Sequence, residues 1–463
     1  MSSFSGISTA LSSLQAQRIA LEVSGQNIAN ANTVGYTRQR ANIQSIPGVE
    51  SPTFQRPGFG AEITGIERLG NIFLDARVRA TGSSSSFLAA RADAYARIES
   101  TMNEPSDTGL SSTLNELWSG FQEVAKAPQT LATKQVVLER AQSVAHAIGA
   151  GYTALETQWS QHRTEIEDRV SEVNSAAQAV ADLNGQIQLM QVTGSNANEL
   201  IDQRQTLIQR LSELTGATAR FHENGTADVS VGGNLLVTGK TAQKMAVDGA
   251  PSFSSVMETG AQLRVIWDRA TPTPVSFDGG EISGILTATA PEAEGGLLAT
   301  TAAGYNAIAT DLATQVNDLL ITADGGTPLF QITGDPAAKR LDVIITDPAQ
   351  LKVGAVGMGE HDGTIADKIA QLAIAEDGPT AQWKTLAVSV GVAAKAAESS
   401  FAVAYNAYET ASGLQLSSAS VDIDEETVNM LAFQRGYQAA SRVLTTVDEM
   451  LDQLINRTGV VGR

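Results

Sequence analysis

The chain has 463 residues, a net charge of −19 and no cysteine. A strongly acidic chain repels phosphate groups, so neither nucleic acid nor an anionic membrane surface is an expected partner. The lack of cysteine excludes thiol catalysis, disulfides and cysteine-ligated metal sites. The sequence has no run of 18 apolar residues and no basic segment followed by an apolar one at its start, so we expect neither membrane insertion nor a cleaved signal peptide.

The N-terminal segment carries apolar residues at intervals of seven. The four positions are Ile7, Leu14, Leu21 and Ile28. The positions between them that would complete a heptad are weak, so this helix should gain its stability by docking onto a partner. The stretch 27–40, rich in Asn, Thr and Gly, ends the helix and turns the chain. Residues 43–69 contain three prolines and several glycines, which predicts a loop with short strands.

Two helices are predicted next, over 72–102 and 110–126, from apolar residues at helical spacing. The stretch 82–86 reads Gly-Ser-Ser-Ser-Ser and interrupts the first pattern. Two interpretations remain open, a weak point within one helix or a linker between two. Pro128 ends the second helix.

The longest predicted helix covers residues 130–192. The residues of its apolar face are separated by alternating intervals of three and four positions. At one point two intervals of four follow each other, which relaxes the supercoil locally. The face consists of Ile148, Tyr152, Leu155, Trp159, His162, Ile166, Val170, Val173, Ala177 and Val180. Gly194 and Ser195 break the helix, and residues 198–214 should fold back as the second arm of an α-hairpin.

The residue pattern changes from helical to alternating at Gly216. Alternating residues on both sides of Gly232–Gly233 predict a β-hairpin, and we place a small β domain at 217–285. Helices are predicted again at 297–320, 364–375 and 381–411, with a short strand at 341–346. The fold class is therefore mainly α with an inserted β domain, in which a body of long helices is built from both N- and C-terminal parts of the chain.

The C-terminal segment holds the most regular pattern in the chain. Its apolar residues alternate spacings of three and four without a break: Met430, Phe433, Tyr437, Ala440, Leu444, Val447, Leu451 and Leu454. Acidic residues at 422–426 suit the start of a helix, and Gly459 suits its end. Two interpretations fit this helix and the N-terminal one. They are ordinary amphipathic helices of a globular core, or a coiled coil between the termini that is completed only in an assembly.

Few residues suggest catalysis or metal binding. The four histidines are scattered, and His162 on its helical face is more simply a packed residue than a ligand. Gly239-Lys240-Thr241 resembles the end of a phosphate-binding loop, but Asn234 stands where that motif requires glycine. The acidic cluster at 422–426 is explained by helix-start electrostatics. We therefore expect no catalytic residue, no cofactor and no metal.

Two segments resemble the signatures of bacterial flagellar axial proteins, which form rods, hooks and hook-associated structures. The sequence NIANANTVGYTRQ at 27–39 resembles their N-terminal signature, and FQRGYQAASRVLTTVDEMLDQLI at 433–455 resembles their C-terminal one. Arg38-Gln39 after Gly-Tyr-Thr, and the predicted hairpin with DLNGQIQ at 182–188, resemble the family of hook-associated proteins at the hook–filament junction. The signature positions are Asn27, Asn30, Asn32, Thr33, Gly35, Tyr36, Arg38 and Gln39.

The resemblance implies a structural subunit of the extracellular flagellum rather than an enzyme. Its partners would be other copies of itself in a ring or helical lattice, hook protein, the next hook-associated protein, and an export chaperone at the C-terminal helix. It implies export through the flagellar type III apparatus and assembly through the terminal helices. A rod or hook protein is the nearest alternative, and a cytoplasmic coiled-coil scaffold or an enzyme are more distant ones.

Three domains are expected from the patterns and the resemblance together. They are a terminal coiled-coil domain at 1–60 and 420–463, a helical body at 61–216 and 286–419, and the inserted β domain at 217–285.

Overall fold

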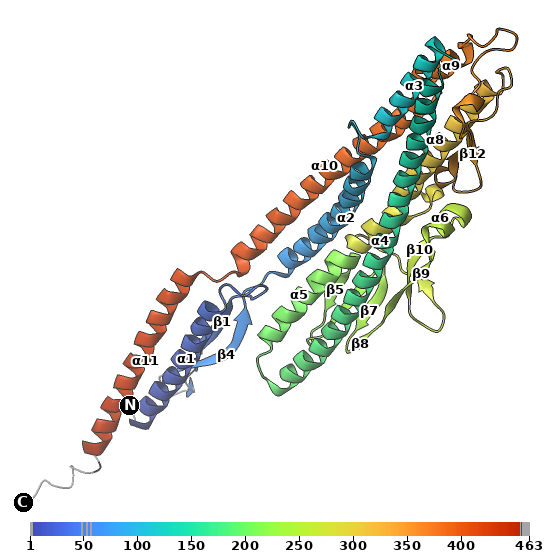
Figure 1. The fold of residues 1–463 in the computed structure, drawn as a ribbon. Coiled ribbons are helices and arrows are strands. Elements are labelled where there is room, and N and C mark those ends of the chain that lie inside the picture. The colour runs from blue at the N-terminus through green and yellow to red at the C-terminus, as the bar shows by residue number, and fades with distance from the viewer. Residues whose placement is uncertain (1–2, 48–49, 52–53, 56–57, 454, 456–463) are drawn as a thin grey trace, which may run out of the picture.

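The computed structural model describes residues 3–47, 50–51, 54–55, 58–453 and 455. The molecule is elongated, and both ends of the chain lie at the same end of it (Figure 1). There, α1 (Ser3–Ala29) lies beside α11 (Ile423–Asp452). A Cβ on Gly6 would lie 3.5 Å from Val447 and one on Gly436 2.9 Å from Gln17, so the two helices run antiparallel. We call this pair the terminal rod.

A β-hairpin follows the turn after α1. Strands β1 (Gln39–Ser45) and β4 (Ala61–Arg68) pair antiparallel, with Gln39 opposite Arg68. The two-residue strands β2 (Glu50–Ser51) and β3 (Phe54–Gln55) pair within the connection. The domain boundary expected at residue 60 is wrong, because it would separate β1 from β4.

The body begins with α2 (Ile72–Met102), which packs along α10 (Pro379–Ala419). Helix α2 is continuous through 82–86, so the interpretation of this stretch as a linker is wrong. Glycine allows close packing there, since a Cβ on Gly82 would lie 3.3 Å from the Tyr408 ring. Helix α10 is longer than the predicted 381–411.

The body is centred on α4 (Leu131–Thr193), which packs against α3 (Leu110–Lys126) and α5 (Asn198–Thr215). Each of the ten residues predicted as its apolar face is buried, His162 included. Gly194 ends α4 in a left-handed conformation with φ 71°, which glycine adopts at little cost. The predicted helix and its hairpin are therefore confirmed.

Two small antiparallel sheets lie along the α4–α5 hairpin (Figure 1). One has the order β5 (Thr218–Phe221), β6 (Ala227–Val231), β7 (Asn234–Thr238), β8 (Thr241–Ala242). The other has the order β11 (Thr273–Pro274), β10 (Leu263–Trp267), β9 (Met245–Gly249), with α6 (Phe253–Thr259) between its strands in sequence.

The β region shares one hydrophobic core with the helices. Buried Val229 and Val265 belong to the same cluster as Val173 of α4. The expected C-terminal limit of 285 is wrong, because α7 (Gly280–Thr289) begins before it and packs on α2. The strands are therefore a layer of the body as well as an insertion in its sequence.

The remaining body elements complete the end of the molecule farthest from the terminal rod (Figure 1). They are the 3₁₀ helix η1 (Glu292–Glu294), α8 (Leu297–Leu320), β12 (Phe330–Ile332), η2 (Ala337–Lys339), β13 (Leu341–Val343), η3 (Pro348–Gln350), α9 (Thr364–Ala370) and η4 (Gln371–Ile374). The predicted strand at 341–346 is shorter than expected. With these elements the fold class predicted from the sequence is confirmed.

The outer side of α10 is apolar and uncovered. Val388, Val392 and Val403 are each more than half exposed. The helical stretch Thr364–Asp452 contains a window of 18 residues that is long and apolar enough to cross a membrane by length and composition, and 17% of it is buried. This test uses length and composition only, so the expectation that the chain does not insert into a membrane stays a prediction.

Candidate assembly site

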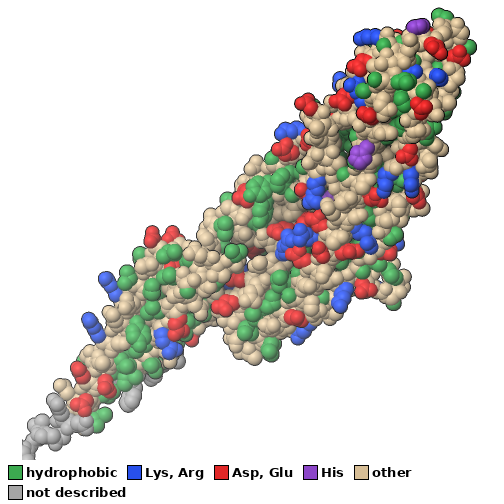
Figure 2. All heavy atoms as spheres, viewed as in Figure 1, with side chains coloured by type: hydrophobic (Ala, Val, Ile, Leu, Met, Phe, Trp, Pro, Cys, Tyr) green, Lys and Arg blue, Asp and Glu red, His purple; other side chains and the backbone are tan. Residues whose placement is uncertain are grey.

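The terminal rod is only partly buried. On α11, Met430, Phe433, Leu444, Val447 and Leu451 are half-buried. Tyr437 is 40% exposed, and the predicted position Leu454 lies outside the described residues. Glu426 is the only buried residue of α11 in the described part of the chain. Hydrophobic side chains are visible on the surface of the rod (Figure 2).

Helix α1 buries a face made mainly of small residues. Ala10, Ala16, Ala20 and Val23 are buried. The four positions predicted from the spacing of seven, Ile7, Leu14, Leu21 and Ile28, are half-buried and flank this face. Small side chains allow the hairpin strands and α11 to approach α1 closely, and a search for large apolar residues overlooks them. The structure therefore corrects which residues of α1 form its central contact.

Asn27, at the end of α1, fixes the turn that follows. Its Nδ2 donates to the Gln39 carbonyl (2.8 Å), while its Oδ1 accepts the Gln39 N–H (3.0 Å) and the Tyr36 hydroxyl (2.9 Å). Burial, together with the carboxylates of Asp202 and Glu199, raises the pKa of Tyr36 to about 12, which keeps its hydroxyl a donor. The first signature residue thus ties the end of α1 to the start of β1.

Arg38 joins this turn to the C-terminal helix. Its guanidinium contacts Glu426 at 2.7 Å and Glu425 at 2.9 Å, and its backbone N–H donates to the Ala419 carbonyl (2.9 Å). Asp422 caps α11 by accepting the N–H groups of residues 424 and 425. The acidic cluster is therefore a helix start, as predicted, and two of its members also bind Arg38. Hydrogen bonding from Arg38 lowers the pKa of Glu425.

Asp202 on α5 joins the same turn to the body. It is 5% exposed, and it accepts the Thr37 N–H (3.1 Å) and Arg68 Nε (2.8 Å). Burial raises the pKa of Asp202, and the charge of Arg68 opposes that change. Asn198 Nδ2 adds hydrogen bonds to Gln39 Oε1 and to the Ile66 carbonyl.

Arg68, Asn198 and Asp202 were not predicted as site residues from the sequence. The predicted helical arm at 198–214 contains Asn198 and Asp202, but its helical pattern does not show which residue contacts the turn.

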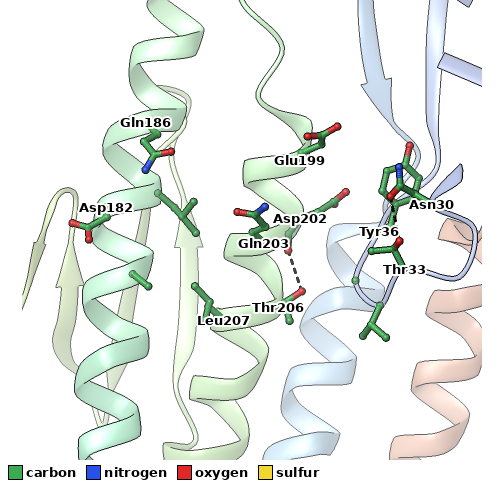
Figure 3. Close-up of a pocket in the computed structure, with 14 residues that line it drawn as sticks. Asn30, Thr33, Tyr36, Asp182, Gln186, Glu199, Asp202, Gln203, Thr206 and Leu207 are labelled. Atoms are coloured by element: carbon green, nitrogen blue, oxygen red, sulfur yellow. Dashed lines mark hydrogen bonds between the residues drawn. The ribbon is translucent and has the colours of Figure 1, made fainter. Parts of the chain in front are cut away.

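A cleft of about 710 Å³ lies between this turn and the α4–α5 hairpin. Asn30, Thr33 and Tyr36 line it from the turn, and Asp182 on α4 and Glu199 on α5 are among the residues that line it from the hairpin (Figure 3). The Thr33 hydroxyl donates to Asn30 Oδ1 (3.2 Å) and shapes the turn. Asn32 and Val34 are exposed, and Gly35 has φ 80° with room for no Cβ beside Thr206. The eight signature residues therefore lie at the end of α1, in the turn that follows it and at the start of β1.

The described residues contain no group of three or more His, Asp or Glu side chains that could hold a metal ion. Gly239-Lys240-Thr241 forms the turn between β7 and β8, where Asp228 accepts the Gly239 N–H (2.9 Å), so it is a hairpin turn. Burial lowers the pKa of His162, whose Nδ1 contacts Glu165 at 3.3 Å. The arrangement is suited to holding helices together.

The model of the flagellar hook-associated protein FlgK helical domain matches residues 95–327, which are 233 of the chain's 463 residues. The chain belongs to the FlgK family of flagellar hook-associated proteins. Models of flagellar basal body rod proteins match its two ends, at 7–37 and 415–457. This family membership makes the chain a structural protein of the bacterial flagellum.

Known proteins are similar over the full length of the chain. It is 28% identical to flagellar hook-associated protein 1 of Bacillus subtilis, with 100% of both chains covered, and 23% identical to the Escherichia coli protein of that name, with 97% of this chain and 99% of the other covered. The structure of the flagellar hook junction protein FlgK from Burkholderia pseudomallei superposes with a TM-score of 0.62 at 15% identity. It covers 75% of this chain and 100% of the other. That superposition supports the shared fold.

Proposed function

We propose that the chain joins hook to filament as a structural subunit, and that it assembles through the exposed surface of its terminal rod. Copies of the chain pack beside one another in a ring or helical lattice. Hook protein contacts this lattice on one side and the next hook-associated protein on the other. The similarity to flagellar hook-associated protein 1 of two bacteria supports the place in the flagellum. The exposed apolar residues of the terminal rod support its use as the assembly surface.

The observation that carries the proposal is the apolar surface left open on α11. Val428 is 66% exposed, and Leu431, Val443 and Met450 are each more than half exposed. These residues lie outside the half-buried face that contacts α1. Helix α11 therefore has two apolar sides, and α1 covers one of them. Contiguous apolar surface left open on a folded subunit is typical of a protein interaction site. The uncovered valines of α10 extend that surface along the body.

The same features fit export before assembly. Within the described chain, α11 buries only one residue, so the terminal rod contributes little to the stability of the monomer. The terminal rod can therefore be unfolded and threaded at a small cost in free energy. The lack of cysteine avoids crosslinks on the passage from a reducing to an oxidising environment. We infer export by the flagellar type III apparatus without a cleaved signal peptide, and a chaperone that covers the C-terminal helix until export.

The match to the middle of the chain distinguishes a hook-associated protein from a rod or hook protein. The matches at the two ends are to rod proteins and fit any axial subunit, whereas the match at 95–327 is to the hook-associated family. A rod or hook role is therefore the weaker proposal. Insertion of α10 into a membrane is also weaker, because α10 packs along α2 for much of its length.

The proposal is tested by placing a charge on the rod. Val443→Asp places a carboxylate on the exposed apolar side of α11. A neighbouring subunit that covers this side would bury the charge without a partner, at a cost on the order of 2 kcal/mol or more. We expect the purified variant to keep a cooperative melt of the body. It should be absent from the hook ends of sheared flagella, with loss of swimming. The matched control is Thr445→Asp, which adds the same charge at an exposed position of the same helix that lies between its two apolar sides. Normal junctions in the Val443→Asp strain would refute the proposal.

A further inference from the structure

The terminal rod carries two arginines without a carboxylate partner. Its basic residues are Arg18, Arg435 and Arg442. Arg18 pairs with Glu22 on the same helix, whereas the two arginines of α11 are exposed and form no ion pair with a described residue. Nine residues separate Arg435 from Leu444, which at about 100° per residue places the arginine on the side of α11 opposite its contact with α1. The exposed side of α11 is therefore both apolar and basic, and basic side chains project from the surface of the rod (Figure 2).

The cleft beside the signature turn (residues 30–37) has the opposite charge and an apolar wall. Its carboxylates Asp182 and Glu199 are exposed, and neither forms an ion pair with a described residue. Val34, which is 92% exposed, and the half-buried Leu207 supply apolar surface in the same cleft. The cleft therefore suits a helix that presents an apolar side chain and a basic one on the same side.

The exposed side of α11 and the cleft lie on opposite sides of the subunit. In Figure 1, α11 lies on one side of α1, while β4 and the α4–α5 hairpin lie on the other. Asn198 Nδ2 donates to the Ile66 carbonyl (3.0 Å), which holds the hairpin beside β4. Two different surfaces on opposite sides allow identical copies to bind head to tail, and such contacts either close into a ring or continue as a helical lattice. A second copy of the chain therefore has both the charge and the placement that the cleft requires.

We propose that α11 of a neighbouring copy docks into this cleft. Its Leu431 packs against Val34 and Leu207, and its Arg435 pairs with Glu199. The inference rests on the proposed function, because it names the surface that covers the exposed side of α11. Charge complementarity selects α11 as the occupant, since its two arginines are the unpaired cations of the terminal rod.

The register of the two helices allows both contacts to form together. Helix α11 runs away from the body and α5 runs into it, so the docked helices are antiparallel (Figure 1). Leu431 precedes Arg435 by one helical turn, and Gln203 follows Glu199 by one turn, about 6 Å in each case. From Glu426, which binds the signature turn, to Arg435 is about 14 Å along α11. Neighbouring copies are therefore offset along the rod by about 14 Å or less.

The chain has no cysteine, so introduced cysteines are its only thiols. Two full-length variants with different tags are co-expressed, one with Gln203→Cys on the wall of the cleft and one with Ala432→Cys on the exposed side of α11. Mild oxidation of sheared flagella should yield a disulfide-linked dimer that carries both tags. The matched control replaces Ala432→Cys by Thr446→Cys, which is also exposed and lies about 21 Å farther along α11. This control should give at most about one tenth of the mixed dimer, because the distance exceeds what a disulfide can span.

Charge reversal provides a second readout. Glu199→Arg and Arg435→Glu should each lower the amount of the chain in sheared flagella about tenfold, because like charges then meet at the contact. The double variant restores opposite charges and should recover most of that amount. The matched control combines Arg435→Glu with Glu223→Arg, since Glu223 is an exposed carboxylate that does not line the cleft. This combination should show no recovery.

The outcomes separate this inference from the proposed function. Absence of the mixed dimer, or failure of the charge-reversed double variant to recover, would overturn the inference, while loss of junctions in Val443→Asp would still support the proposed function. A maleimide that labels Gln203→Cys as fast in sheared flagella as in the monomer would show an open cleft and would also overturn it. So would a crosslink from Gln203→Cys to a different flagellar protein in place of a second copy.

Discussion

Arg38 offers the sharpest test of how the terminal rod is attached to the body. Arg38→Ala leaves the carboxylate of Glu426, which is 2% exposed, without its only ionic partner in the described chain. Breaking a buried ion pair by removing one member costs about 3–5 kcal/mol. The Arg38 side chain is 18% exposed and keeps some contact with water, so we take the lower end of this range. The first turns of α11 should therefore open about a hundredfold more often, at about 1.4 kcal/mol per factor of ten.

The measurement is amide hydrogen exchange of residues 423–433 in the full chain. Arg38→Ala should lower protection there by about a hundredfold while α4 keeps its own protection. Glu425→Gln is the matched control, because its side chain is 57% exposed and its contact with Arg38 is screened by water. The double variant Arg38→Met with Glu426→Met should recover most of the loss, since it removes both buried charges together.

Two results would refute this reasoning. One is exchange of residues 423–433 at the unprotected rate in the wild-type chain, which would mean that the Arg38 pair does not hold the helix start. The other is an equal effect of Arg38→Ala and Glu425→Gln, which would mean that burial of Glu426 is irrelevant to the strength of the contact.

Two predictions concern the body. His162 is buried near Glu165, Asp93 and Arg97, and burial lowers its pKa. As the pH falls, His162 is therefore protonated near pH 6.5 in the unfolded chain and only at a lower pH in the folded chain. The free energy of unfolding should fall as the pH drops below about 6.5, and His162→Gln should flatten this dependence in urea titrations at several pH values. Asn184→Ala should cost about 3 kcal/mol in the same assay. A cost similar to that of exposed Gln178→Ala would contradict it.

The Asn184 prediction follows from its place between three segments. Asn184 is fully buried, its Nδ2 donates to the Ala227 carbonyl (2.8 Å), and its Oδ1 accepts the Ala227 N–H (2.9 Å) and Arg204 (2.9 Å). Truncation leaves the β6 backbone and the Arg204 guanidinium unsatisfied at once.

Long helices with one buried face could be predicted from the sequence. The apolar period of α4 depends on neighbours three and four residues apart, so the ten predicted positions needed no knowledge of what packs on them. Gly194 marked the hairpin for an equally local reason, since a left-handed residue ends a helix. The start of α11 was predicted from its acidic residues in the same way.

Individual polar contacts and strand pairings between distant segments could not be predicted. Asp202 lies 165 residues from Thr37, and nothing in a sequence period connects them. The boundary expected at residue 60 failed because the pairing of β1 with β4 crosses it, and strand pairing across a loop leaves no periodic signal. The limits of the β region failed because its strands share a core with α4. A change of period marks where strands begin, but it does not show that they fold as a separate domain.

Two charged contacts connect the signature turn to its neighbours, one to α11 and one to the body. They explain how the subunit can be ordered although much of the terminal rod is exposed. Arg38 holds the start of α11, and Asp202 holds the strand end beside it, both through charges that are largely removed from water. Charged contacts of this kind are sensitive to geometry, so they fix the direction in which the rod leaves the body more than they stabilise the rod itself. Beyond them, α1 and α11 contact each other through alanines and half-buried apolar side chains. The contacts that fix the geometry of the subunit are therefore concentrated at the junction, and the apolar surface that a neighbouring subunit could cover lies along the rest of the rod.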